Sequence, residues 1–244
     1  MEIRAETTQY YELNKQIKKL AEKPGEIVVK GVFGQRYMGC GLKKHTKLSV
    51  HGTLGNDSAC YMDGATLEVY GNVQDGIANT MNDGTLIIHG NCGDIMGYAM
   101  RGGSVYVKGY AGYRAGIHMK EYMDKSPKIV IGGKAGDFLG EYMAGGRIVV
   151  LGLGLGPDEL AAGRFYGTGM HGGRMYIRGK LNEALAGKEI MEAPLDDEDK
   201  AFLKQTIDEY AAYFGAGLSG VKIEDFKKYQ PKSKRPYGNM YIAN

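Results

Sequence analysis

The chain has 244 residues, of which 43% are hydrophobic, and its formal net charge is +3 at pH 7. This near-balance of charge gives no reason to propose a nucleic-acid or membrane-surface partner. No stretch approaches the about 18 apolar residues of a transmembrane helix, and the first residues, MEIRAETTQYY, lack the apolar region of a signal peptide. Cys40, Cys60 and Cys92 are odd in number and far apart, which fits reduced thiols and predicts a cytoplasmic protein.

The first predicted element is an amphipathic helix over residues 8–22, TQYYELNKQIKKLAE. It places Leu13, Ile17 and Leu20 on one face and ends before Pro24 and Gly25. We expect residues 1–25 to form a helical cap on the strands of the adjoining segment, because a stack of strands must cover its ends.

An internal repeat begins at residue 26. Its unit is 19 residues long, as the spacing of Gly52, Gly71, Gly90 and Gly109 shows, and some turns carry insertions. Each copy is a short strand that ends in glycine, and the eight copies are EIVVKG (26–31), KLSVHG (47–52), TLEVYG (66–71), TLIIHG (85–90), SVYVKG (104–109), KIVIGG (128–133), RIVVLG (147–152) and RMYIRG (174–179).

The second and fourth residues of every copy are apolar, which predicts one buried face per strand. A strand that recurs in one orientation, with no helix between copies, must coil. Residues 26–180 are therefore predicted to form an all-β, single-stranded, right-handed parallel β-helix of about seven to eight coils, stacked about 4.8 Å apart. The whole chain is interpreted as one domain.

Glycines and methionines also recur between the strands. We interpret the six methionines in register as core-filling side chains and not as a copper site: Met62, Met81, Met100, Met119, Met143 and Met170. The glycine-rich stretch LGLGLGPDEL (151–160) has Pro157 at the third glycine position of a dinucleotide fingerprint, so its last eight residues, LGLGPDEL (153–160), are predicted to be an inserted loop after the seventh strand.

A second helix is predicted in residues 195–215, within a C-terminal extension of residues 181–244. Asp196 to Asp199 lie near its start, where the helix dipole favours acids, and Gly215 ends it. Its apolar stripe consists of Leu203, Ile207, Tyr210 and Phe214. We expect this helix to cover the other end of the stack, and residues 223–241 to be an extended basic tail.

The residues predict no catalytic, cofactor-binding or metal site. Three scattered cysteines cannot hold an iron–sulfur cluster, and the five histidines share no ligand spacing, although His51 and His89 lie at the same outward position two coils apart. A strip of apolar outward positions is the candidate partner interface: Ile87, Tyr106, Val130, Val149, Leu151 and Tyr176. The alternative is that a terminal segment of this chain covers the strip.

Four stretches closely resemble the glycine-repeat domain of glutamate synthase, which is the C-terminal, third domain of its large subunit. They are GQRYMGCGL (34–42), MNDGTLIIHGNCGDIMGYAMRGG (81–103), GYRAGIHMKEYMDKSPKIVIGGKAGDFLGEYMAGG (112–146) and GTGMHGGRMYIRG (167–179). The resemblance covers nearly the whole chain and points to the stand-alone form of this domain. The repeat is also similar to that of the C subunit of formylmethanofuran dehydrogenase.

The resemblance implies a right-handed β-helix without catalytic residues. It implies a scaffold subunit of a split glutamate synthase, whose partners are a glutamine amidotransferase chain and a synthase chain that carries FMN and Fe–S clusters. This chain would itself bind no cofactor. The alternatives are a structural subunit of a formylmethanofuran dehydrogenase-like complex and an independent hydrolase of small esters, for which no nucleophile is evident. Self-association into a homo-oligomer stays open.

Overall fold

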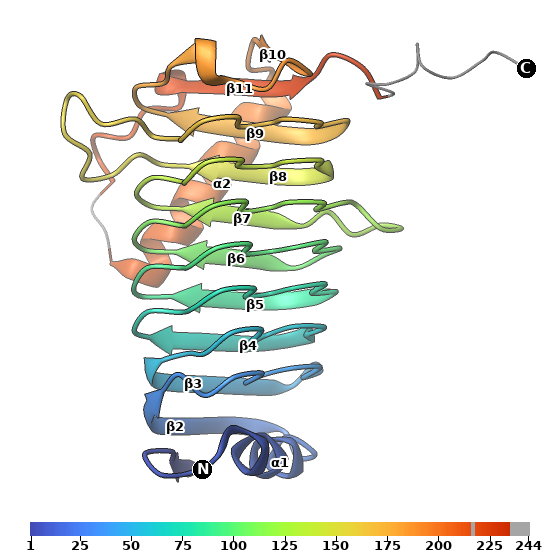
Figure 1. The fold of residues 1–244 in the computed structure, drawn as a ribbon, viewed down its shortest axis with the longest axis vertical. Helices are drawn as coiled ribbons and strands as arrows, with labels where there is room; N and C mark the ends of the chain where they lie inside the picture. Colours follow the sequence, from blue (N-terminus) through green and yellow to red (C-terminus); the bar gives the residue numbers. More distant parts are fainter. Residues whose placement is uncertain (216–217, 235–244) are drawn as a thin grey trace, which may run out of the picture.

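The computed structural model describes residues 1–215 and 218–234 (Figure 1). It is mostly β, with two α-helices, α1 (Tyr10–Leu20) and α2 (Asp197–Phe214), and two short 3-10 helices, η1 (Glu183–Leu185) and η2 (Ile223–Asp225). The strands are β1 (Glu2–Arg4), β2 (Gly25–Phe33), β3 (Thr46–Thr53), β4 (Asp63–Tyr70), β5 (Asp83–Ile88), β6 (Ser104–Val107), β7 (Lys128–Ile131), β8 (Ala144–Val150), β9 (Gly172–Arg178), β10 (Ile190–Ala193) and β11 (Phe226–Pro231).

Strands β1 to β9 form a parallel sheet in sequence order, so that the chain winds as a solenoid (Figure 1). The eight predicted strands are β2 to β9, and each pairs in register with the next. Two ladders of aliphatic side chains run up the inside, and all sixteen are at most 1% exposed: Ile27, Leu48, Leu67, Leu86, Val105, Ile129, Ile148 and Met175, and Val29, Val50, Val69, Ile88, Val107, Ile131, Val150 and Ile177. The predicted buried face is confirmed.

A further ladder of single β-bridges runs along a second side of the solenoid. It joins six rungs: Leu54, Val73, Cys92, Ala111, Ala135 and Ala162. The solenoid therefore has about 6 turns, compared with the seven to eight coils expected. The six rungs follow strands β3 to β8. Strands β2 and β9 also belong to the sheet, but the segments that follow them have no residue in this second ladder, so they are not counted as full turns. The six aligned methionines are fully buried, as predicted.

Tight packing between coils explains one of the recurrent glycines. A Cβ atom at Gly55 would lie 2.2 Å from the carbonyl oxygen of Gly34 in the coil below. The atoms nearest to this Cβ belong to the backbone, which cannot move out of the way as the end of a flexible side chain can. Any other residue at this corner would therefore push two coils apart.

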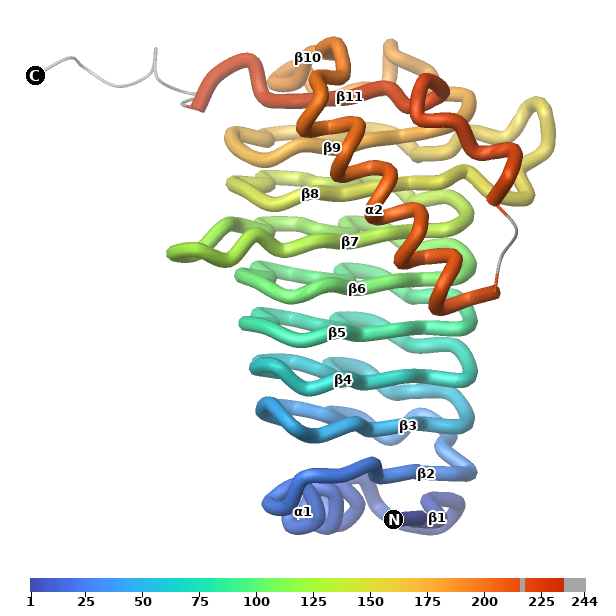
Figure 2. The backbone as a smooth tube through the Cα atoms, turned by 180° about the vertical axis from the view of Figure 1, so that it is seen from behind, coloured from blue at the N-terminus to red at the C-terminus, as the bar shows by residue number. Residues whose placement is uncertain are grey.

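The N-terminal end is covered as predicted. Helix α1 buries Leu13 and Ile17 on the core, and Leu20 packs against it at the edge. The structure adds β1, which the repeat did not predict, as a parallel partner of β2. Figure 2 shows α1 and β1 together beneath β2.

The C-terminal end differs from the expectation. Helix α2 does not cover it. Instead β11 pairs antiparallel with β9, and β10 pairs antiparallel with β11, so the direction of the sheet reverses at this end. The predicted extended tail is thus a sheet strand over Phe226–Pro231, and its last residues, 235–241, lie outside the described residues.

Helix α2 lies on the outside of the sheet and crosses strands β6 to β9 diagonally (Figure 2). Its predicted limits are confirmed. The Asp196 side chain accepts the backbone N–H of Asp199 in a reciprocal capping box, and Gly215 ends the helix in the left-handed region at φ 61°. In the part of the chain that the structure describes, neither helix is long and apolar enough to cross a membrane.

Candidate interaction surfaces

The strip predicted as a partner interface is buried by the chain itself. Five of its six side chains form a second core with residues of α2 and β11: Tyr106, Val130, Val149, Leu151 and Tyr176. The sixth, Ile87, is 4% exposed. The interpretation of this strip as a free docking surface is therefore wrong, and the alternative of a covering terminal segment is the correct one. The physical reason is that the stripe of α2, with Leu203 and Tyr210, is complementary to the strip.

Buried ion pairs attach α2 to the solenoid. The carboxylate of Asp199 accepts hydrogen bonds from the Tyr176 hydroxyl at 2.6 Å, from Arg174 at 2.8 Å and from Lys228 of β11. Burial by itself raises the pKa of Asp199, but the hydrogen bonds from Lys228 and Tyr176 outweigh burial and hold this pKa well below its usual range. Asp199 therefore joins α2, β9 and β11 as a carboxylate.

A second polar contact lies further along α2. Glu209 accepts hydrogen bonds from the Tyr106 hydroxyl and from Lys128, and these outweigh burial and lower its pKa. The Tyr210 hydroxyl donates to the backbone oxygen of Lys108 at 2.9 Å, and burial raises the pKa of Tyr210 to about 12. These groups act as structural anchors, because each is already bonded to another part of the chain.

The histidines lie apart from one another on the solenoid, except for those of one outer column. In the described ranges 1–215 and 218–234, no group of three or more His, Cys, Asp or Glu is placed to hold a metal ion. His51 and His89 do share one outer column, but the ring of Tyr70 stacks between them, with centroids 4.7 Å from His51 and 4.6 Å from His89. The column is a ring stack on the surface of β3 to β5.

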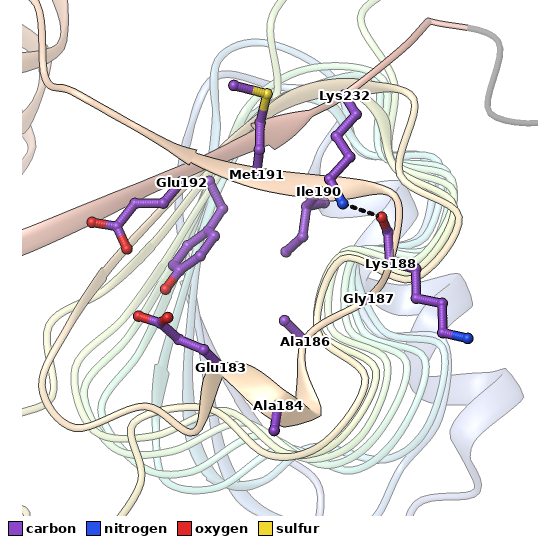
Figure 3. A pocket seen from close by; sticks show the side chains of 10 residues that line it. Glu183, Ala184, Ala186, Gly187, Lys188, Ile190, Met191, Glu192 and Lys232 are labelled. Carbon is purple, nitrogen blue, oxygen red and sulfur yellow. Dashed lines mark hydrogen bonds between the residues drawn. The ribbon is translucent and has the colours of Figure 1, made fainter.

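A hollow of about 350 Å³ lies at the C-terminal end of the solenoid, next to η1 and β10 (Figure 3). Its acidic side chains, Glu183 and Glu192, are both paired with Lys227. On the other side Lys232 donates to the backbone oxygen of Lys188 at 2.7 Å, which is the dashed line in Figure 3. Three of the four charged side chains that line the hollow, Glu183, Glu192 and Lys232, are therefore already bonded to other parts of this chain.

An uncovered aromatic face lies on the turns that follow the second ladder. Two columns of side chains form it. One column consists of Tyr98, His118 and Tyr142, and the other of Ile95, Arg114, Phe138 and Phe165. The rings of His118 and Tyr142 stack at 5.2 Å, and those of Phe138 and Phe165 at 5.1 Å. Four of these side chains are 36–46% exposed: Ile95, Tyr98, Tyr142 and Phe165. We call these seven residues the aromatic face.

The backbone of the aromatic face is held in an unusual conformation. Six of its seven residues have positive φ, between 52° and 62°, a region that bulky residues rarely adopt: Ile95, Arg114, His118, Phe138, Tyr142 and Phe165. Each donates its N–H to a carbonyl of the following coil, for example Arg114 to Asp137 at 2.8 Å and Tyr142 to Thr168 at 2.8 Å. These bonds make the turns rigid and fix the direction of the exposed rings.

The sequence pattern did not predict this face, because only glycine and methionine positions were followed through the turns between the strands. The signal was present: aromatic residues recur two and six positions after the corner glycines Gly136 and Gly112, as Phe138, Tyr142 and His118. The structure brings them together because those positions of consecutive coils lie side by side.

Comparison of the sequence with known proteins identifies the family of this chain. The sequence matches the GXGXG motif family over residues 2–235. The chain belongs to this family. The match covers nearly the whole chain and is consistent with the glutamate synthase C-terminal domain family. The chain is also 42% identical to an uncharacterized protein of Methanocaldococcus jannaschii, over 99% of this chain and 96% of that protein.

Proposed function

We propose that the chain is a non-catalytic structural subunit of a split glutamate synthase. Its partners would be a glutamine amidotransferase chain and a synthase chain, and the FMN and Fe–S clusters would reside on the latter. The observation that carries this proposal is the match to the GXGXG motif family, which spans residues 2–235 and is consistent with the C-terminal domain of glutamate synthase.

The aromatic face is the surface that best suits a partner. Tyrosine, phenylalanine and arginine are enriched at protein interfaces, and the rigid aromatic rings bury a large area at a small cost in side-chain entropy. The rings of Tyr142 and Phe165 are partly exposed and fixed by stacking on their neighbours. A partner that docked on the apolar strip would have to displace α2, which already covers it. A partner that docked on the aromatic face would displace none of the described segments of this chain.

Affinity purification of the tagged chain from a native extract tests the proposal. We expect an amidotransferase chain and a flavin-containing chain to co-purify with it. The combined variant Tyr142→Ser and Phe165→Ser should weaken at least one of these associations by about 30-fold or more, as expected for the loss of an interface hot spot. Tyr122→Ser is the matched control, because Tyr122 is 48% exposed on the loop before β7 and outside the aromatic face.

Other results would contradict the proposal in distinguishable ways. A molybdenum or tungsten protein in the same purification would favour a formylmethanofuran dehydrogenase-like assembly. Recovery of the chain alone under conditions that preserve complexes would argue against any scaffold role. Equal losses in the Tyr122 control and the double variant would show that the aromatic face is not the docking site.

A further inference from the structure

The solenoid places two cysteines from consecutive coils side by side. Cys40 and Cys60 are 20 residues apart, close to the 19-residue unit of the repeat, and their sulfur atoms are 3.2 Å apart. The Cys60 thiol donates a hydrogen bond to the sulfur of Cys40. The sequence suggested that these cysteines are isolated, and only the coil register reveals the pair.

Backbone hydrogen bonds hold the two cysteines in this position. The N–H of Gly41 donates to the carbonyl of Cys60 at 2.9 Å, and the N–H of Ala59 donates to the carbonyl of Met38 at 2.7 Å. The two turn segments are therefore paired directly on either side of the sulfur atoms. This backbone pairing holds the two thiols side by side.

The two thiols differ in access and in acidity. Cys40 is partly exposed, whereas Cys60 is 5% exposed. The hydrogen bond from Cys60, together with the positive charge of Lys18 on α1, lowers the pKa of Cys40 to about 6 despite partial burial. The same hydrogen bond raises the pKa of Cys60. Cys40 is thus the more accessible and the more acidic thiol of the pair.

Cys92 provides an internal comparison. It is 2% exposed within the second ladder, and burial raises the pKa of its thiol well above the usual value. A buried thiol of this kind is inert.

We propose that Cys40 and Cys60 form a redox-active dithiol that reacts with low-molecular-weight disulfides. The Cys40 thiolate attacks one sulfur of the small disulfide, forms a mixed disulfide and releases a small thiolate. Cys60 then loses its proton to solvent and attacks the sulfur of Cys40, which forms the Cys40–Cys60 disulfide and releases the second small thiolate. The two protein thiols are oxidised, and one small disulfide is reduced to two thiols.

Anaerobic incubation of the full chain with hydroxyethyl disulfide tests this proposal. The free thiols are then alkylated and the protein is digested with trypsin and an endoprotease that cleaves after glutamate. The sequence gives separate peptides for the three cysteines: residues 37–43 with Cys40, 48–68 with Cys60 and 69–101 with Cys92. We expect a disulfide between peptides 37–43 and 48–68, reversible by dithiothreitol, while peptide 69–101 stays fully alkylated.

Single substitutions separate the two roles. Cys60→Ser keeps a hydroxyl beside Cys40 and should accumulate the mixed disulfide on Cys40. Cys40→Ser should not react, and Cys92→Ser should behave like the unmodified chain. A stable mixed disulfide on the unmodified chain, a link to peptide 69–101 or the absence of any reaction would each overturn the proposal.

The pH dependence of the first step gives an independent test. For a thiol with a pKa of about 6, the thiolate fraction falls about twofold between pH 8 and pH 6. For an ordinary thiol with a pKa of about 8.5, the thiolate fraction falls about 75-fold over the same range. The rate of loss of free Cys40 should therefore fall about twofold over this range. A fall of more than about 20-fold would show that Cys40 is an ordinary thiol.

Discussion

Replacing Asp199 with asparagine tests how strongly the buried ion pairs hold α2 and β11 on the solenoid. The carboxylate of Asp199 is fully buried, and Tyr176, Arg174 and Lys228 all donate to it. Asparagine keeps the size of the side chain but removes its charge. Lys228, itself 5% exposed, would keep only Asp196, at 3.5 Å, as an ion-pair partner among the described residues.

The expected loss follows from these contacts. Removing one member of a buried ion pair costs about 3–5 kcal/mol when the other charge is left uncompensated. Here Lys228 keeps Asp196, and Arg174 keeps Glu198 at 3.5 Å, and both of these carboxylates are largely exposed. Exposed pairs contribute about 0–1 kcal/mol each, so we expect the free energy of unfolding to fall by about 2–4 kcal/mol.

Urea unfolding and native-state hydrogen exchange provide the assay. Exchange should accelerate in α2 and β11, because these elements meet at Asp199, and should change little in β3 to β5. Asp197→Asn is the matched control, since Asp197 lies in the same helical turn with its side chain fully exposed. If the two variants lost stability equally, or if both lost less than about 0.5 kcal/mol, the reasoning about the buried carboxylate would be refuted.

The same site predicts a pH effect with a definite sign. The pKa of Asp199 in the folded protein lies below its ordinary value, because hydrogen bonds from Lys228 and Tyr176 outweigh burial. The stabilisation is therefore fully present above the unfolded-state pKa of about 3.9 and is lost as the pH falls from about 4 toward the lower folded-state pKa. Protection of α2 should decline over that range in the unmodified chain. In Asp199→Asn this contribution should be missing.

Three further substitutions test the packing of the solenoid and of α2. Val107→Asp would bury an unpaired charge in an inner ladder and should abolish cooperative folding, so a soluble variant with a normal thermal transition would contradict the register. Gly55→Ala should cost more than about 2 kcal/mol because its Cβ would meet backbone at 2.2 Å, whereas Gly220→Ala, which meets nothing within 4 Å, should stay within about 0.5 kcal/mol in thermal melts. Tyr210→Phe removes the hydrogen bond to Lys108 and should lower stability by about 0.5–1.5 kcal/mol in urea, and no change would show that this anchor is dispensable.

The inner ladders could be predicted because their cause is local and repeated. Each strand has apolar residues at its second and fourth positions, and a 19-residue spacing lets each pair stack on the previous one. The presence of α1 and α2 could be predicted for a similar reason, although α1 is two residues shorter at each end than expected. Capping by Asp196 and termination at Gly215 depend on residues next to each other in the chain.

The surfaces could not be predicted in this way, because they depend on which distant segments meet. An apolar strip has the same sequence whether solvent, a partner or α2 covers it, and the structure decides for α2. The aromatic face depends on left-handed turns at residues such as Phe138 and Tyr142, which intrinsic preference disfavours and hydrogen bonds to the next coil enforce.

Sequence by itself determined the parallel orientation of the repeated strands, the buried aliphatic ladders and the family of this protein. These features follow from a periodic pattern that is visible in short segments of the chain. Only the tertiary structure decided which faces stay open, how β11 and β10 close the C-terminal end, and that Cys40 and Cys60 touch. The reason is that insertions in the coils and the return of the C-terminal segment set which distant residues meet. The contacts between these residues form, and contribute to stability, only when the solenoid has folded.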